Sequence, residues 1–173
     1  MAQEKQITMS MIKESNKIYN ETVDIPVTIS GEEYTVKMYP FFSPEKVREC
    51  VDSRNEFLIK ADKEKLQIPQ HEIDDITGYF IISHFTNLKL NLNKKAKSVY
   101  SDFKEALNSP LFKVLMKSFP QESIKDVYDR IFDLLEAQGK LEDQLQQFQE
   151  QIAELPLENR DVIFGKQKQI SEV

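Results

Sequence analysis

Polar and apolar residues alternate along one short stretch near the start of the chain, residues 24–39. Apolar side chains at every second position are typical of a β-strand with one buried face. The alternation breaks at Ser30-Gly31-Glu32, a sequence that suits a tight turn between two strands. The pattern therefore predicts a β-hairpin. Because two strands alone are marginally stable, we expect this hairpin to lean on helices or to pair with further strands.

Helical spacing of apolar residues follows the hairpin, and proline and capping residues divide it into segments. The first helix should begin at Ser43-Pro44, since serine is a good N-cap and proline suits the first helical position. A second helix is predicted from Gln70 to about Lys89, and its wide apolar face indicates the central core helix. Two shorter helices are predicted, one over residues 98–108 and one that begins at Ser109-Pro110.

The last and longest predicted helix runs from Gln121 to Leu155, where apolar residues follow a seven-residue repeat. Alternating spacings of three and four residues are typical of a helix that packs against another helix. In the first half, Tyr128, Phe132 and Leu135 widen this face, so we expect it to be buried in its own domain. In the second half only a narrow seam remains between glutamate and glutamine residues.

The narrow seam provides the candidate partner-binding residues, with the one polar position setting the register of the contact. Its members are Gln138, Leu141, Leu145, Phe148 and Ile152. Two alternatives remain open for this half of the helix. It either projects and binds a partner, or it folds back on its own chain as one arm of a helical hairpin. In the second case the seam would be internal core.

The pattern as a whole predicts a mainly α (α+β) protein, with a small N-terminal β-hairpin and a helical domain that ends in a long C-terminal helix of coiled-coil character. We expect four parts. They are a flexible N-terminal arm (1–22), the hairpin with the helical domain (23–137), the projecting or hairpin-forming half of the long helix (138–156) and a C-terminal tail (157–173). The tail holds a small apolar cluster, Val162, Ile163 and Phe164.

Composition limits the class of protein. The chain has 173 residues, 40% of them hydrophobic, which is enough for one domain with a real core. No apolar run approaches the roughly 20 residues of a membrane span, and the N-terminus lacks the apolar stretch of a signal peptide. Cys50 is the single cysteine, which excludes an internal disulfide and fits a reducing cytosol. We therefore expect a cytoplasmic protein without a membrane partner.

The negative charge is concentrated in the long helix. Residues 121–155 contain nine acids and three bases, a net charge of −6 that equals the formal charge of the whole chain. This acidity argues against nucleic acid as a partner and favours a basic protein. A solvated acidic face that only maintains solubility is the simpler alternative. The lysine-rich linker at residues 87–97 has no interleaved aromatic residues, so we expect it to be solvated as well.

Residues that carry chemistry are sparse. His71 and His84 lie thirteen positions apart, with no cysteine pair near either, so no zinc spacing exists. No phosphate-binding loop or nucleophile motif is present. The adjacent acids Asp74 and Asp75 would point in different directions on a helix, which makes them poor candidates for a shared-proton pair. We expect no catalytic site, no metal site and no cofactor.

The order of these parts resembles the tail assembly chaperones of long-tailed phages and prophages of Gram-positive bacteria. The resemblance covers about residues 25–155 and rests on organisation. The matching segments are the hairpin VTISGEEYTVKMYPF, the aromatic-rich helix ITGYFIISHFTNL, the Ser-Pro helix, and the long polar helix SIKDVYDRIFDLLEAQGKLEDQLQQFQEQI.

The resemblance implies a non-enzymatic protein of the bacterial host's cytoplasm. Such chaperones bind the long helical tape measure protein, keep it soluble and help to recruit tail tube subunits around it. An alternative from a different class is a self-associating coiled-coil protein, a structural or scaffold component of a phage or prophage. A third, supported only by the charge, is a small acidic regulator of a host protein.

Overall fold

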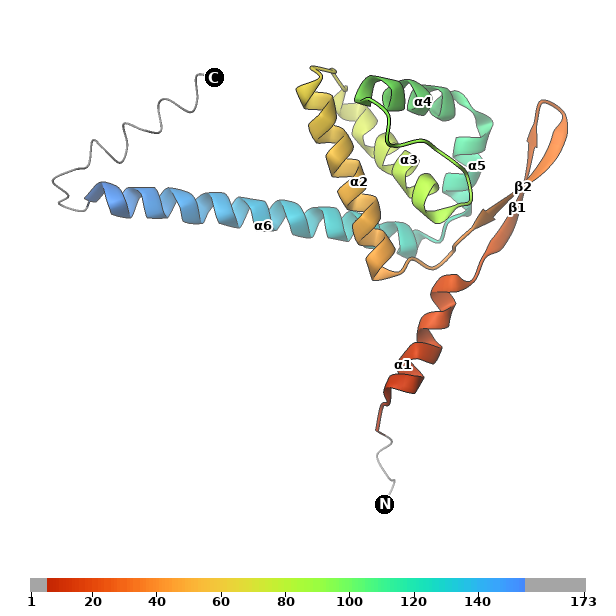
Figure 1. Cartoon of the computed structure of the whole chain (residues 1–173), viewed down its shortest axis with the longest axis horizontal. Helices are drawn as coiled ribbons and strands as arrows, with labels where there is room; N and C mark the ends of the chain where they lie inside the picture. Colours follow the sequence, from red (N-terminus) through yellow and green to blue (C-terminus); the bar gives the residue numbers. More distant parts are fainter. Residues whose placement is uncertain (1–5, 155–173) are drawn as a thin grey trace. The chain divides into compact units, whose positions relative to one another are not determined.

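A computed structural model describes residues 6–154 of the chain (Figure 1). Two compact units divide within the last helix, after Ile131. The elements are α1 (Met9–Ser15), η1 (Asn16–Asn20), β1 (Val23–Ile29), β2 (Glu32–Met38), α2 (Pro44–Lys63), η2 (Gln70–Glu72), α3 (Ile73–Phe85), α4 (Ala96–Asn108), α5 (Pro110–Ser118) and α6 (Gln121–Glu154). The predicted fold class is confirmed: the protein is mainly α, with a small hairpin followed by a helical domain that ends in a long helix. The short elements α1 and η1 precede the hairpin.

The hairpin forms where alternation predicts it. β1 and β2 pair antiparallel, with Ile25 opposite Val36 and Val27 opposite Tyr34. Ser30 and Gly31 form the two-residue turn with φ of 53° and 86°, the left-handed values that a type I′ turn requires at both positions. Glycine adopts such a φ without strain, so the tight turn fixes the register of the two strands.

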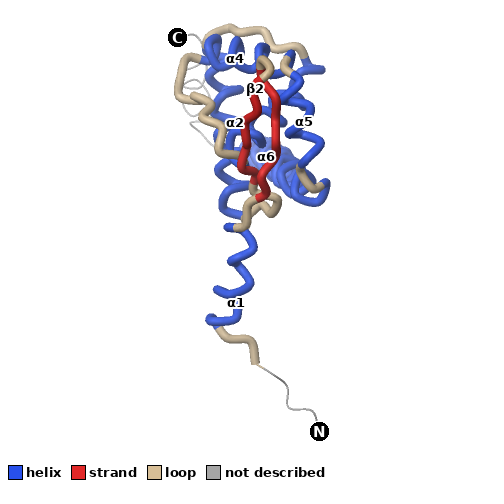
Figure 2. The backbone as a smooth tube through the Cα atoms, turned by 90° about the vertical axis from the view of Figure 1, so that its right-hand side faces the viewer, coloured by secondary structure: helices blue, strands red, loops and turns tan. Residues whose placement is uncertain are grey.

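Helices and a loop support the hairpin, as its marginal stability demands. Beyond α3, Asn87 donates its backbone N–H to the carbonyl of Lys37 (3.0 Å), while its side-chain oxygen accepts the N–H of Lys37 (2.9 Å). Thr86 forms an isolated bridge with Met38. These contacts cover the base of the β2 edge, and β1 lies beside α5 (Figure 2). Val27, Val36 and Met38 are buried as a result.

α3 is the central core helix, as its wide apolar face predicts. Eight of its 13 residues are buried. The ring of Phe85 stacks on Phe42 with centroids 3.5 Å apart, and Phe119 meets Phe42 edge-on at 5.4 Å. The helix ends at Phe85, earlier than predicted, because Thr86 is extended and donates its hydroxyl to the carbonyl of Ile82.

The predicted helix starts are confirmed at two serines. The hydroxyl of Ser43 accepts the N–H of Lys46, and the hydroxyl of Ser109 accepts the N–H of Leu111. Proline follows each serine at the start of the helix. Each serine thus satisfies one of the N–H groups that a helix leaves without a partner in its first turn.

The N-terminal segment, predicted to be a flexible arm, contains two short helical elements. Residues 9–20 are helical in α1 and η1, and the flexibility of the arm stays a prediction. Thr8 caps α1 by accepting the N–H of Met11 (3.4 Å). Neither element buries a residue. Seven residues are too few for a hydrophobic period to show in sequence, so propensity and the cap were the only available signals.

α6 begins in the first unit and is tied to it at its start. The hydroxyl of Ser123 donates to the carbonyl of Pro40 (2.7 Å), and Val127 and Ile131 are buried. The expected burial of Phe132 and Leu135 is wrong, since these side chains are 63% and 59% exposed. Phe132 follows buried Ile131 by one residue and therefore points about 100° away around the helix. The predicted tail cluster and Leu155 lie outside the described residues.

Candidate functional site

The candidate seam lies on one continuous helix, in the unit that begins at Phe132. Leu141, Leu145 and Phe148 are spaced by four and three residues, which places them along one side of α6. Gln138 precedes them by one turn. Ile152 continues the same helix, with only its backbone described. The backbone therefore places all five predicted residues on one element at the spacing of a helix-packing seam.

The described seam side chains are exposed to solvent. Leu141 is 56% exposed, Leu145 52% and Phe148 60%. The projecting and the hairpin-forming alternatives for this half of the helix both stay predictions. Large apolar side chains that repeat along an exposed helix mark a site for another molecule, because burying them is favourable.

The surroundings of the seam are polar and acidic. Residues 132–154 contain six acids and one base, which gives a net charge of −5. Gln138 donates its amide to the carboxylate of Glu142 (3.0 Å), and the single base, Lys140, pairs with Glu136 (2.6 Å). Both contacts join residues four apart on the same helix. They leave a net negative surface on either side of the apolar seam, which favours a partner with basic residues.

Phe132 and Leu135 extend the exposed apolar surface beyond the predicted seam. The sequence pattern predicted both on the buried face, because buried and exposed apolar residues look alike in a periodic pattern. The burial of Ile131 one residue earlier settles the assignment. The exposed apolar surface of α6 therefore has two sectors, the predicted seam and a second sector formed by Phe132 and Leu135.

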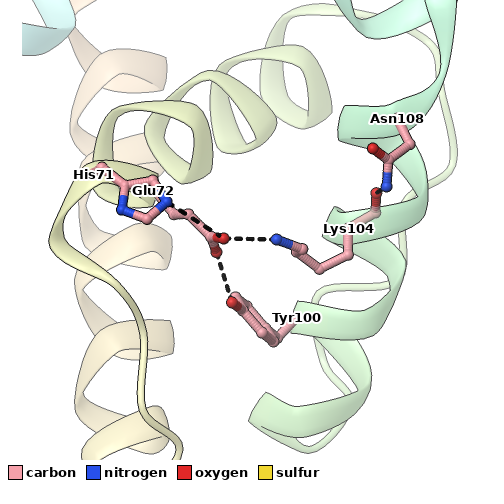
Figure 3. Close-up of polar contacts among 5 residues, drawn as sticks. All are labelled: His71, Glu72, Tyr100, Lys104 and Asn108. Carbon is pink, nitrogen blue, oxygen red and sulfur yellow. Dashed lines mark hydrogen bonds and ion pairs between the residues drawn. The ribbon is translucent and has the colours of Figure 1, made fainter.

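A buried polar cluster in the first unit was not predicted. Glu72 is 6% exposed, and its carboxylate accepts the hydroxyl of Tyr100 and the ammonium of Lys104, each at 2.6 Å (Figure 3). His71 lies 4.0 Å away on the exposed side. The hydrogen bonds from Lys104 and Tyr100 lower the pKa of Glu72, and the same carboxylate raises the pKa of Tyr100 to about 12.

This cluster joins η2 to α4. Each carboxylate oxygen of Glu72 accepts a hydrogen bond from a side chain of α4, so the contact holds the two elements together. Asn108 extends the contact by donating to the carbonyl of Lys104 (2.9 Å). The signal that could have revealed it is the four-residue spacing of Tyr100 and Lys104, which places two donors on one face of α4.

We expect Glu72→Gln to lower the free energy of unfolding at neutral pH by roughly 1.5 kcal/mol, since the buried carboxylate loses its charge while the ammonium of Lys104 stays 41% exposed to solvent. The native pKa of Glu72 is lowered, so its contribution is present above the pKa of the unfolded chain and disappears as the pH falls through the native pKa. Urea unfolding at neutral and acidic pH should therefore show a difference that shrinks in acid.

The control for this prediction is Glu56→Gln, which removes an exposed carboxylate 3.8 Å from Lys60. An exposed pair of this kind contributes only about 0.5 kcal/mol. Equal effects of the two substitutions, or an effect of Glu72→Gln that does not depend on pH, would contradict the assignment of a buried charged cluster.

Among residues 6–154 no group of three or more histidine, cysteine, aspartate and glutamate side chains is arranged to hold a metal ion. Within the same range no helix combines the length and the apolar character that crossing a membrane requires.

Comparisons with known proteins place the chain among phage-related sequences. The chain is similar to a protein of Bacillus subtilis (strain 168), the SPbeta prophage-derived protein YomO, with 24% identity over 125 residues that cover 72% of each chain. No solved structure matches. The model of the YomO family matches residues 9–165, from the start of α1 to beyond the end of α6. That match spans most of the chain, which therefore belongs to the YomO family, a family with a prophage-derived member.

Proposed function

We propose that the chain is a non-enzymatic tail assembly chaperone of a phage or prophage. It binds the tape measure protein through the seam on α6 and helps to recruit tail tube subunits, in the cytoplasm of the bacterial host. It acts without a cofactor and without a nucleic acid or membrane partner. The prophage origin of the matched YomO protein supports the phage setting, and the resemblance of the chain's organisation to tail assembly chaperones supports the role.

The exposed seam is the observation that carries this proposal. Leu141, Leu145 and Phe148 present a narrow apolar line that fits the apolar face of another helix. A tape measure protein is long and helical, so it offers such faces repeatedly. Its exposed apolar faces would otherwise associate with one another, and covering them with an acidic helix would keep the complex in solution.

The test uses cells that produce the whole phage or prophage. The chain is tagged at its N-terminus and recovered in two forms, full length and ending at Lys140, and the recovered proteins are identified by mass spectrometry. We expect full-length chain to recover the tape measure protein and the shortened chain to lose it. Recovery by both forms would place the site outside the seam. Recovery of neither the tape measure nor the tube protein would contradict the proposed function.

Self-association through the same seam is the second candidate, which would make the chain a structural or scaffold component. Gln138 is the observation that favours it, because one polar residue in an otherwise apolar coiled-coil seam fixes register and oligomeric state. In that case the full-length chain recovers only copies of itself, and the form that ends at Lys140 has a lower mass in solution.

A further inference from the structure

An apolar groove lies in the first unit, apart from the seam. It has a volume of about 450 Å³ and is bordered by α3, α5 and single residues of α4 and α6. Its floor is apolar and half-buried for the most part. The floor residues are Gly78, Leu107, Phe112, Met116 and Tyr128. A Cβ atom at Gly78 would lie 3.2 Å from the sulfur of Met116, so the side chains of Met116 and Phe112 pack directly on the glycine in this floor.

The two rims of the groove carry opposite charges. Asp74 and Asp75 of α3 line it together with Lys113 and Lys117 of α5. Within residues 6–154 none of these four side chains takes part in an ion pair. The groove thus combines an apolar floor with unpaired charges of both signs, which suits a short amphipathic segment that carries both signs itself.

The described part of the N-terminal arm, residues 6–20, combines apolar side chains with charges of both signs, and its apolar side chains are exposed. Its large apolar side chains are between 39% and 79% exposed: Ile7, Met9, Met11, Ile12 and Ile18. Five such residues within fifteen form an apolar surface that a monomer does not usually leave in water. Between them stand Lys13, Glu14 and Lys17, two bases and one acid.

We propose that the arm of one copy of the chain occupies the groove of a second copy. The two surfaces match in kind. The methionines of the arm meet Met116 in the floor, and flexible thioether side chains adapt well to one another. Lys13 and Lys17 complement the aspartate rim, while Glu14 complements the lysine rim. The exposed pair of Glu14 and Lys17 seen in the structure is weak and is readily exchanged for these partners.

Exchange of arms between two copies produces two identical contacts related by a two-fold axis, which closes the assembly as a dimer. The contact lies outside the seam, so it goes beyond the proposed chaperone function and leaves α6 available for a client. Replacing Leu145 and Phe148 of the seam with alanine should therefore leave this dimer intact.

The first test compares full-length chains by light scattering and sedimentation over a range of concentrations. Met11→Asp with Ile12→Asp should raise the dissociation constant of the dimer by about tenfold or more, because two apolar contacts are lost. Ser10→Asp with Ser15→Asp adds the same charge to the arm without removing an apolar side chain, and should have little effect. A wild-type chain that stays monomeric, or a dimer insensitive to Met11 and Ile12, would overturn the proposal.

A second test locates the contact. Chains that carry Met11→Cys are mixed with chains that carry Lys113→Cys and treated with a bifunctional thiol-reactive cross-linker. The native Cys50 is buried and does not compete. Cross-links between copies should form with Lys113→Cys. The control Lys60→Cys, at an exposed residue of α2, should form none. Equal cross-linking at both positions would overturn the assignment to this groove. The proposal would also be overturned if a chain that carries both Met11→Cys and Lys113→Cys formed cross-links only within itself.

Discussion

Replacing Leu145 and Phe148 with alanine is expected to abolish recovery of the tape measure protein while leaving the fold intact. Both side chains are more than half exposed, so removing them deletes no packing in the described chain. In a complex, each of the two side chains would contribute about 1.5–3 kcal/mol to the binding free energy by being buried. Losing both contributions weakens binding by more than about a hundredfold. The measurement is recovery of the client from phage-producing cells, with circular dichroism and thermal unfolding of the purified variant.

The matched control is Gln144→Ala with Gln147→Ala, which makes the same number of alanine substitutions on the same turns of α6. Neither residue belongs to the seam, and both are exposed. This control should bind the client as well as the unaltered chain does. If the seam variant loses its fold together with binding, the seam is internal core and the binding proposal is wrong. If it retains full binding, the client uses another surface.

Phe85→Ala is expected to cause the largest loss of stability. Its side chain is fully buried, stacks on Phe42, and lies where α3 meets the base of the hairpin. Truncating a buried phenylalanine costs about 3–5 kcal/mol, a large share of the 5–15 kcal/mol that stabilises a typical domain. Thermal unfolding should show a melting temperature lowered by roughly 10 °C or more.

Phe132→Ala provides the control, with the same chemical change at a side chain that is 63% exposed. We expect a change in unfolding free energy within about 0.5 kcal/mol, since no cavity is created. Equal losses at the two positions would show that Phe132 is packed in solution, and the second exposed sector of α6 would then not exist.

Elements whose signals are local were predictable from the sequence. The hairpin follows from strict alternation on either side of Ser30-Gly31, and two helix starts follow from serine before proline. The helical run of α6 up to Glu154 follows from a sustained repeat. In each case the deciding interaction joins residues only a few positions apart, so the sequence pattern contains it directly.

Features that depend on distant contacts were not predictable. Whether Phe132 or Ile131 is buried depends on which side of α6 meets the first unit, and periodicity alone cannot decide this. The pairing of Glu72 with Lys104 joins residues 32 positions apart. In the groove between α3 and α5 the side chains of Met116 and Phe112 pack on Gly78, although in the sequence Gly78 looks like an unfavourable residue inside a helix.

The candidate site was predictable in part. The spacing of Leu141, Leu145 and Phe148 was evident from the sequence, and it predicted a helix contact without deciding between an internal and an external partner. Leu141, Leu145 and Phe148 are more than half exposed on α6, and the choice between an internal and an external partner stays a prediction. The periodic pattern does not contain the chemical identity of the partner. Only the charge of α6 and the family membership of the chain bear on it.

The attachment of α6 to the hairpin base also determines when the protein can fold during synthesis. Ser123 bonds to Pro40 across 83 positions, and Phe119 packs on Phe42. The stack of Phe42 on Phe85 needs only the chain up to α3, whereas the contacts of Phe119 and Ser123 need the start of α6. We therefore expect the hairpin base to complete its packing late in translation, once residues 119–123 have left the ribosome.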